Sequence, residues 1–474
     1  MLIVFITKVF IMRLWVPRIQ IGAKLKYIGI VEAIEADIKE KLVKPGDRLP
    51  SQRIIAKQLN IDLSTVTRAL KEASKRGLVE TLKGSGSFIA QTAFSSYNSM
   101  SLTEGKMIDL SMNNPPHPSS INLQNEIAQG LVEISSHQLL AHQLNYQETA
   151  GNPIDREAGA IWLQHRMGNI SGDQILVSSG AHSALFSIFS YLKNSCHVVA
   201  APVLTYPGLR VIADHLELDV AGVAMDDDGI IPEDFERICL TRKPNVLYVI
   251  PNIDNPTTAT LSEARRHRLI EIARKFDVTL IEDDPYAPFQ TECLPTLYSL
   301  APERTWHIAT LSKCISPALR VAYVVAPDMS QALLLAEKMR ISNLMAPPLM
   351  TALASHWIKN GTISKISNAI KTENSTRQAL AASIFEKSHF SADPTGPHIW
   401  LKLPPHWRAL EFTEYALLSG VSIVPSSAFV SDTLLTQAVR ISLGGVMDIE
   451  SLKNALTILA NLIQQNKPRN NVIV

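Results

Sequence analysis

The chain has 474 residues, of which 46% are hydrophobic and 19% are charged. This length predicts at least two domains, and the apolar content excludes a mostly disordered protein. The four cysteines include no CxxC pair and the 13 histidines show no ligand spacing, so we expect neither a disulfide framework nor a metal site. The scarcity of cysteine is typical of a reducing, cytoplasmic compartment.

The formal net charge of +1 hides an uneven distribution along the chain. Residues 22–90 hold 13 Lys and Arg against 8 Asp and Glu, whereas the chain from residue 91 onward holds 29 basic and 36 acidic residues. A basic N-terminal part on an acidic body favours contact with nucleic acid at one end only. Chance variation in surface charge is the alternative interpretation.

The first eleven residues are apolar apart from one lysine, but they are too short to span a bilayer and lack the basic start of a signal peptide. We interpret them as a poorly determined start, with Met12 as a second candidate initiator. No other segment approaches eighteen uninterrupted apolar residues, so the sequence predicts no membrane partner.

Residues 22–90 show the pattern of three helices and two short strands. The first helix is predicted from the spacing of its apolar residues, which are Tyr27, Val31, Ile34 and Ile38. Ser51 is predicted to cap a second helix that turns Ile54, Ile55 and Leu59 inward, and Ser64 to cap a third. In the third helix the core-facing residues are Val66, Leu70 and Ala73, and the opposite face carries Thr65, Arg68 and Lys71.

Two short strands around a glycine turn follow at residues 78–89 and predict a wing. Three helices and a wing form a winged helix-turn-helix, whose third helix fits the major groove of DNA. A small helical bundle with a solvated polar face is the alternative that periodicity leaves open.

The segment from Gly46 to Ala90 resembles the GntR-type winged helix-turn-helix, above all in PGDRLPSQR, TVTRAL and GSGSF. The resemblance implies binding to double-stranded operator DNA. The residues that it implies for DNA contact are Arg48, Arg53, Ser64, Thr65, Thr67 and Arg68, with Lys83 and Gly84 in the wing. Some members carry an arginine near the start of the third helix, where this chain has Leu63.

Residues 91–107 are rich in Ser and Thr and predict a flexible linker between a DNA-binding domain at residues 22–90 and a body at residues 108–470. In the body, short apolar runs alternate with helical stretches, which predicts an α/β domain with a largely parallel sheet covered on both faces. The runs that we interpret as strands are 174–178, 197–201, 246–250, 279–281, 305–309 and 321–325.

Ligands in such folds bind at the carboxyl ends of strands, and four loops there carry chemistry. A Gly180-Ala181-His182 turn at a helix start suits a phosphate, and Tyr206 is suited to stacking on a flat ring. Asp283 and Tyr286 follow a strand, where capping of a helix by Asp283 or Asp284 is the alternative. The fourth loop places a lysine among apolar residues and an arginine nearby, in TLSKCISPALR.

Together these loops resemble a fold-type I, class I aminotransferase from about Ile108 to Gly445. The resemblance implies pyridoxal 5′-phosphate (PLP) bound as a Schiff base on Lys313, the catalytic lysine of the family. It also implies cofactor contacts from Asp283, Tyr286, Asn255, Tyr206, Gly180, Ala181, His182, Thr310 and Arg320, and Arg440 as the residue that binds the carboxylate of an amino acid. The chain departs from the aminotransferase pattern at Asn113-Asn114-Pro115, at Thr258 and at His182.

A GntR-type domain followed by an aminotransferase-like domain resembles the MocR/GabR family of bacterial regulators. The resemblance implies a homodimeric transcriptional regulator that senses PLP and an amino acid. Two alternatives remain open at this point. One is a genuine PLP-dependent aminotransferase with a regulatory N-terminal domain, and the other is a DNA-binding regulator whose body has lost its cofactor.

Overall fold

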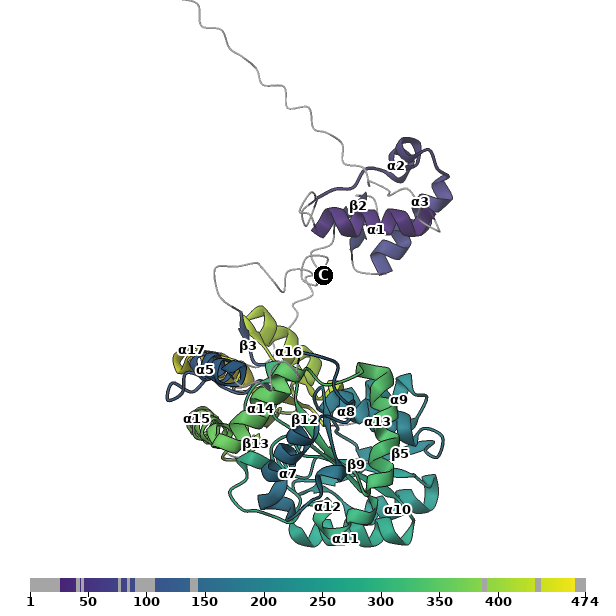
Figure 1. Cartoon of the computed structure of the whole chain (residues 1–474). Helices are drawn as coiled ribbons and strands as arrows, with labels where there is room; N and C mark the ends of the chain where they lie inside the picture. Colours follow the sequence, from purple (N-terminus) through teal and green to yellow (C-terminus); the bar gives the residue numbers. More distant parts are fainter. Residues whose placement is uncertain are drawn as a thin grey trace, which may run out of the picture. The chain divides into compact units, whose positions relative to one another are not determined.

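The computed structural model describes residues 26–39, 43, 47–75, 78–82, 86–89, 107–136, 144–385, 390–430 and 436–464. The chain divides into two compact units, Met1–Lys106 and Met107–Val474 (Figure 1). The predicted linker at 91–107 lies outside the described residues except for Met107, and so do the first eleven residues and Met12.

The first unit has the predicted order of three helices and two strands. Its elements are α1 (Lys26–Lys39), α2 (Gln52–Leu59), α3 (Leu63–Lys75), β1 (Val79–Leu82) and β2 (Gly86–Ile89). The two strands pair antiparallel, with Val79 opposite Ile89. Apolar residues of all three helices and both strands form one core, which includes Ile34, Ile55 and Leu70. This arrangement confirms the winged helix-turn-helix over a plain helical bundle.

Two local predictions in this unit are wrong. The third helix begins at Leu63, so Ser64 lies inside its first turn, and Asp62 is the preceding residue whose carbonyl accepts from the Thr65 amide. Ile54 was expected inside but is 40% exposed. The α2 helix is only eight residues long, so its narrow buried face is filled by Ile55 and Ala56.

The second unit contains a seven-stranded sheet in the order β4-β12-β11-β10-β9-β5-β6. Its strands are β4 (Ile175–Ser178), β5 (Val198–Pro202), β6 (Asp219–Val223), β9 (Val246–Val249), β10 (Thr279–Asp283), β11 (Thr305–Thr310) and β12 (Ala322–Val325). The pairs from β11 to β6 are parallel, and β12 alone runs antiparallel to its neighbours. The expected largely parallel sheet is confirmed. The prediction missed the edge strand β6, whose sequence DVAGV contains Asp and Gly.

Helices cover both faces of this sheet (Figure 1). Side chains alternate along each strand, so Val246 and Tyr248 enter one apolar core while Leu247 and Val249 enter another. The first core is completed by α7 (Pro153–Met167), α8 (Ala181–Leu192), α9 (Pro207–His215), α13 (Met329–Asn343) and α14 (Pro348–Asn360), with α5 (Leu123–Ser136) outside α14. The second core is completed by α10 (Pro232–Arg242), α11 (Glu263–Lys275) and α12 (Leu297–Leu300).

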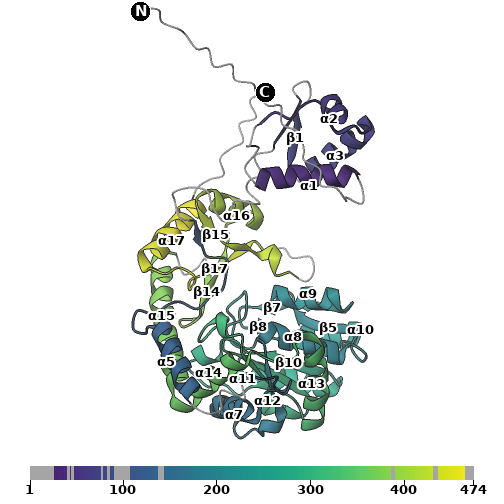
Figure 2. The ribbon, with the colours of Figure 1, turned by 45° about the horizontal axis from the view of Figure 1, so that its top comes forward.

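A smaller sheet lies beside the large one and was not predicted (Figure 2). Its order is β13-β14-β17-β16, with β13 (Phe390–Ala392), β14 (His398–Lys402), β16 (Val424–Pro425) and β17 (Ala438–Ser442) all antiparallel. It packs with α15 (Thr362–Ile384), α16 (Ala409–Leu418) and α17 (Ile449–Gln464) around a separate core. A short parallel pair joins β3 (Ile108–Asp109) to β15 (Val421–Ser422), so the start of the second unit belongs to this smaller part.

Gly444 follows β17 and has no room for a side chain. A Cβ on Gly444 would collide with the backbone oxygen of Asn114 and would lie 2.9 Å from the backbone nitrogen of Pro116. Both neighbours are main-chain atoms, so relief requires the 113–116 segment to move.

We predict that Gly444→Ala lowers the stability of the second unit by about 1–3 kcal/mol, because overpacking displaces well-packed backbone. The thermal unfolding midpoint of the full chain measures the effect. Gly172→Ala is the matched control, since a Cβ there has no neighbour closer than 3.9 Å. Equal midpoints for the two variants would contradict the prediction.

Candidate functional site

A cavity of about 410 Å³ lies at the carboxyl ends of the large sheet's strands and is closed by residues of the smaller sheet. Ten of the eleven residues predicted for cofactor and carboxylate binding line it, and they are Ala181, His182, Tyr206, Asn255, Asp283, Tyr286, Thr310, Lys313, Arg320 and Arg440. The eleventh, Gly180, is the residue directly before α8. The structure therefore brings together residues that span more than half of the sequence.

Lys313 follows β11 and points into this cavity. Its Nζ donates to the backbone oxygen of Asn113 at 2.6 Å. Burial, together with the nearby Arg440 and Arg320, lowers the pKa of Lys313 to about 8, against the opposing effect of Asp283. An amine with this pKa is partly neutral near pH 7 and is suited to attack a carbonyl carbon.

Asp283 ends β10 and is buried. The hydroxyl of Tyr248 donates to its Oδ2 at 2.9 Å, whereas its Oδ1 has no hydrogen-bond partner among the described residues. Burial raises the pKa of Asp283 to about 6, against the effect of the Tyr248 hydrogen bond. A carboxylate with one free oxygen at the edge of a cavity is suited to a protonated ring nitrogen. Neither Asp283 nor Asp284 caps a helix, so that alternative is wrong.

The start of α8 and the side chain of Arg320 together form a candidate anion-binding site. Gly180 has φ of +96°, a backbone conformation that favours glycine, and a Cβ there would lie 2.7 Å from Nη2 of Arg320 and would displace that guanidinium. Arg320 donates to the backbone oxygen of Ser179 at 2.8 Å, which fixes the guanidinium beside the helix N-terminus. Burial, and then Arg320, lower the pKa of His182, so that ring is neutral here. Backbone N–H groups and a fixed cation suit a phosphate.

Arg440 lies on β17 of the smaller sheet and is 7% exposed. Its Nη1 donates to Asn255 Oδ1 at 2.9 Å and its Nη2 donates to the backbone oxygen of Ser111, while Nε has no partner among the described residues. No carboxylate in the described part of the chain forms an ion pair with it. A buried guanidinium without a counter-ion favours an anionic ligand. A carboxylate can accept two parallel hydrogen bonds from the planar guanidinium group.

Sequence reasoning missed three polar residues around the cavity. Tyr248 is the one hydroxyl-bearing residue of the apolar strand β9, and a polar group in such a strand could have indicated its role from the sequence. Asn113 lies within the departure from the aminotransferase pattern noted above, and His398 lies on the unpredicted smaller sheet. The amide of Asn113 contacts both Tyr286 and His398, which lie 173 and 285 residues away in sequence.

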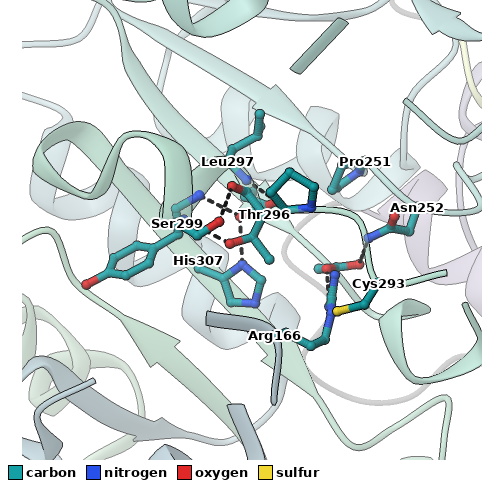
Figure 3. A network of polar contacts seen from close by, with 12 residues as sticks. Arg166, Pro251, Asn252, Cys293, Thr296, Leu297, Ser299 and His307 are labelled. Carbon is teal, nitrogen blue, oxygen red and sulfur yellow. Dashed lines mark hydrogen bonds and ion pairs between the residues drawn. The ribbon is translucent and has the colours of Figure 1, made fainter. Parts of the chain in front are cut away.

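In a buried polar network, Arg166 and Asn252 contact one carboxylate and His307 contacts another (Figure 3). Glu282, Asp284 and His307 present ligand-type atoms within 4.8 Å of one another. Glu282 accepts from the amides of Leu297 and Tyr298 and contacts His307, so its oxygens are already occupied.

The charges of this network are balanced without a metal. Arg166 pairs with Asp284 at 2.5 Å, and Asn252 connects Asp284 to the buried Arg266. Two arginines therefore face two carboxylates. The network fixes the end of β10, on which Asp283 is carried.

A second cavity of about 460 Å³ lies between α7, the loop after β10 and α15. Its cations are already engaged, because Arg166 pairs with Asp284 and Lys371 donates to the backbone oxygen of Gln290. It lacks the excess of positive charge that marks the first cavity.

The predicted DNA-contact residues lie on the first unit. Arg48, Arg53, Ser64, Thr67 and Arg68 are exposed and Thr65 is half-buried, while Lys83 and Gly84 lie outside the described residues. The Arg48 guanidinium is next to Gly86 of the wing. Two of the others are also held by neighbouring helices, since Thr67 contacts Gln52 of α2 and the Arg68 guanidinium lies 4.1 Å over the Tyr27 ring of α1. Leu63 is exposed at the start of α3.

Comparisons with known proteins match both units. Residues 105–459 match the family described as aminotransferase class I and II, and residues 26–89 match the bacterial regulatory proteins of the gntR family. The chain is 28% identical over 459 residues to the uncharacterized HTH-type transcriptional regulator YdeF of Bacillus subtilis (strain 168), covering 95% of this chain and 96% of that protein.

The second unit is also similar to aminotransferases. Aromatic-amino-acid aminotransferase 1 of Thermococcus litoralis is 25% identical over 344 residues, which cover 69% of this chain and 81% of that enzyme. The crystal structure of Pyrococcus horikoshii kynurenine aminotransferase, in complex with PMP, aligns with a TM-score of 0.69 over 79% of this chain and 96% of that chain. At 23% identity, that similarity shows the fold alone. Of the helices that the structure describes, none has the length and apolar character needed to cross a bilayer.

We predict that Arg166→Gln lowers the free energy of unfolding by about 3–5 kcal/mol, because it leaves the buried Asp284 carboxylate without its cation. Chemical denaturation of the full chain measures this loss. Arg242→Gln breaks an ion pair with Asp219 whose two side chains are about half exposed, and it is the matched control with an expected loss of about 0–1 kcal/mol. Similar losses in both variants would contradict the structural role of the network.

Proposed function

Because this chain belongs to the aminotransferase class I and II family and carries a gntR-family DNA-binding domain before it, we propose that it couples cofactor binding to control of transcription. It is a DNA-binding transcriptional regulator of the MocR type, in line with its similarity to HTH-type regulators along almost its whole length. Its cofactor is pyridoxal 5′-phosphate, as in the family of its second unit. We propose that it acts in the cytoplasm, because a transcriptional regulator needs access to DNA.

The observation that carries this proposal is the chemistry of the 410 Å³ cavity. Lys313 would attach the cofactor covalently, and the free Oδ1 of Asp283 would accept from its ring nitrogen. Thr310, Arg320 and the start of α8 would hold the phosphate, and Tyr206 would lie against the ring. When bound, the cofactor supplies an electrophilic carbon conjugated to an electron-withdrawing ring. These side chains support a body that binds the cofactor over a body that has lost it.

The effector that we propose is an amino acid whose carboxylate pairs with Arg440. The guanidinium is buried, its Nε is unpartnered within the described structure, and it has no counter-ion there. Lys313 lines the same cavity and its pKa is lowered by Arg440, so an amino acid whose carboxylate binds Arg440 would direct its amino group toward the cofactor on Lys313.

A short segment connects this site to the DNA-binding unit. Arg440 donates to the backbone oxygen of Ser111 and Lys313 donates to that of Asn113. Only a few residues separate this segment from Met107, where the second unit begins. We propose that ligand binding at Lys313 and Arg440 acts on residues 111–113 and through them on the linker. A homodimer would present two recognition helices to two half-sites.

A catalytically active aminotransferase is the second candidate function. The joint presence of Lys313, Asp283, Tyr286 and Arg440 in one cavity favours it. Sustained transfer of an amino group from an amino acid to a 2-oxo acid, with more than one product molecule per protein chain, would support it.

We predict that the purified full chain acquires a visible absorption band with added PLP and that Lys313→Ala does not. The rate of cofactor attachment should rise with pH and level off above pH 8, because the neutral amine of Lys313 is the nucleophile and its pKa is about 8. Stopped-flow absorbance measures the rate. Lys371→Ala, outside this cavity, is the matched control and should behave as wild type. A band of equal strength in Lys313→Ala would contradict the assignment.

We also predict that Arg68→Glu weakens binding to a mixed-sequence DNA duplex by about tenfold or more and lowers the salt-dependence slope by about one. Cofactor absorption should be unchanged, since Arg68 belongs to the other unit. Fluorescence anisotropy across a salt series measures the slope. Lys193→Glu, a charge reversal on the second unit, is the control. Loss of both DNA and cofactor binding in Arg68→Glu would contradict separate roles for the two units.

A further inference from the structure

Three polar side chains from distant parts of the second unit meet beside Lys313. Asn113 follows β3, Tyr286 follows β10 and His398 begins β14. The amide nitrogen of Asn113 lies 2.8 Å from the Tyr286 hydroxyl and 3.2 Å from Nδ1 of His398. His398 Nε2 lies 3.2 Å from the backbone oxygen of Asp254. All three side chains are at most 5% exposed, so bulk water does not complete their hydrogen bonds.

The backbone oxygen of Asp254 determines where the protons lie in this chain of contacts. A carbonyl oxygen only accepts, so Nε2 of His398 carries the hydrogen. Burial lowers the pKa of His398 to about 3, which keeps the ring neutral and makes Nδ1 an acceptor. The Asn113 atom that faces Nδ1 must then be the amide nitrogen rather than the oxygen. This assignment follows from the hydrogen bonds together with the neutral state of the His398 ring.

The same amide nitrogen donates its second hydrogen to the Tyr286 hydroxyl oxygen. The hydroxyl therefore receives a hydrogen bond from Asn113 and cannot return its own proton to that atom. Burial raises the pKa of Tyr286, so the hydroxyl keeps its proton. Tyr286 lines the cavity next to Lys313, and an acceptor within the cavity is the remaining partner for that proton.

We propose that Asn113, oriented by His398, is a positioning residue that directs the Tyr286 hydroxyl proton to the phenolic oxygen of bound PLP. This inference rests on the proposed function and adds a role to a position where the chain departs from the aminotransferase pattern. The backbone of Asn113 also accepts from Lys313, so one residue contacts both the attachment point of the cofactor and the donor to its ring oxygen.

A hydrogen bond donated to the phenolic oxygen stabilises its ionised form and lowers the pH at which the absorption of bound PLP changes. The charged and titratable groups around Tyr286 are Arg440 on β17, Asp283 on β10, Asp254 in the loop after β9, the neutral His398 on β14, and Lys313 after β11, which lines the same cavity. A change of the Asn113 side chain removes the partner of His398 Nδ1, but it replaces none of these groups and leaves the backbone oxygen that Lys313 contacts in place.

The test is a pH titration of the visible absorption of the PLP-loaded full chain. Asn113→Ala frees the Tyr286 hydroxyl to rotate and should raise the spectral pKa by about one unit, the size expected for losing one hydrogen bond to a charged group. Asn113→Asp should raise the spectral pKa further, because the new carboxylate accepts a hydrogen bond from the Tyr286 hydroxyl and adds a negative charge. Asn114→Ala is the neighbouring control, because the Asn114 side chain lines the same cavity but forms no hydrogen bond with Tyr286 among the described residues.

A double-mutant cycle shows whether the effect passes through Tyr286. In a Tyr286→Phe background, Asn113→Ala should leave the spectral pKa unchanged. The same rise in both backgrounds would overturn the proposal, and so would an unmoved pKa in Asn113→Ala and Asn113→Asp. Should Asn113→Ala fail to fold, His398→Gln gives a second route, with a rise in the same direction expected and no rise overturning the proposal. Absence of any band in wild type would instead overturn the proposed function on which this inference depends.

Discussion

An excess of positive charge around one cavity distinguishes the second unit. Lys313, Arg320 and Arg440 face one cavity, and Asp283 is the one carboxylate among the described residues that line it. Burying Arg440 without a counter-ion is costly, so the cavity favours an anionic ligand. Each cation has a distinct position: Arg320 lies beside the start of α8, Arg440 lies on the smaller sheet, and Lys313 follows β11, where both arginines lower its pKa. A phosphate and a carboxylate at opposite ends would satisfy this arrangement, with an electrophile at the lysine.

The cavity depends on two separately packed parts. The large sheet contributes Asp283 and Lys313, while the smaller sheet contributes Arg440 and, through β14, His398. The segment after β3 lies between them and is held from both sides, by Lys313 at Asn113 and by Arg440 at Ser111. The same segment begins a few residues after Met107, where the second unit starts, so the proposed coupling would act through these hydrogen bonds.

Much of the site could be predicted because strand ends carry local signals. Asp283 and Lys313 each follow a short apolar strand, and the Gly180 turn precedes a helix, so their roles could be inferred together with the family resemblance. The pairing of Asn113 with Tyr286 and His398 could not, because it depends on a small sheet whose short strands have weak periodicity. The predicted Ser64 cap was also wrong, because Asp62 equally suits a helix start and the helix begins at Leu63, one residue before Ser64.

The affinity of the full chain for an operator duplex, selected from random sequence by the wild-type protein, tests the central claim most directly. It is measured by fluorescence anisotropy with and without saturating PLP, for wild type and Lys313→Ala. The account predicts that PLP changes the wild-type affinity by about fivefold or more, a usual size for coupling between sites, and leaves Lys313→Ala unchanged. A wild-type protein that binds PLP, as shown by its absorption, but keeps the same DNA affinity would contradict it.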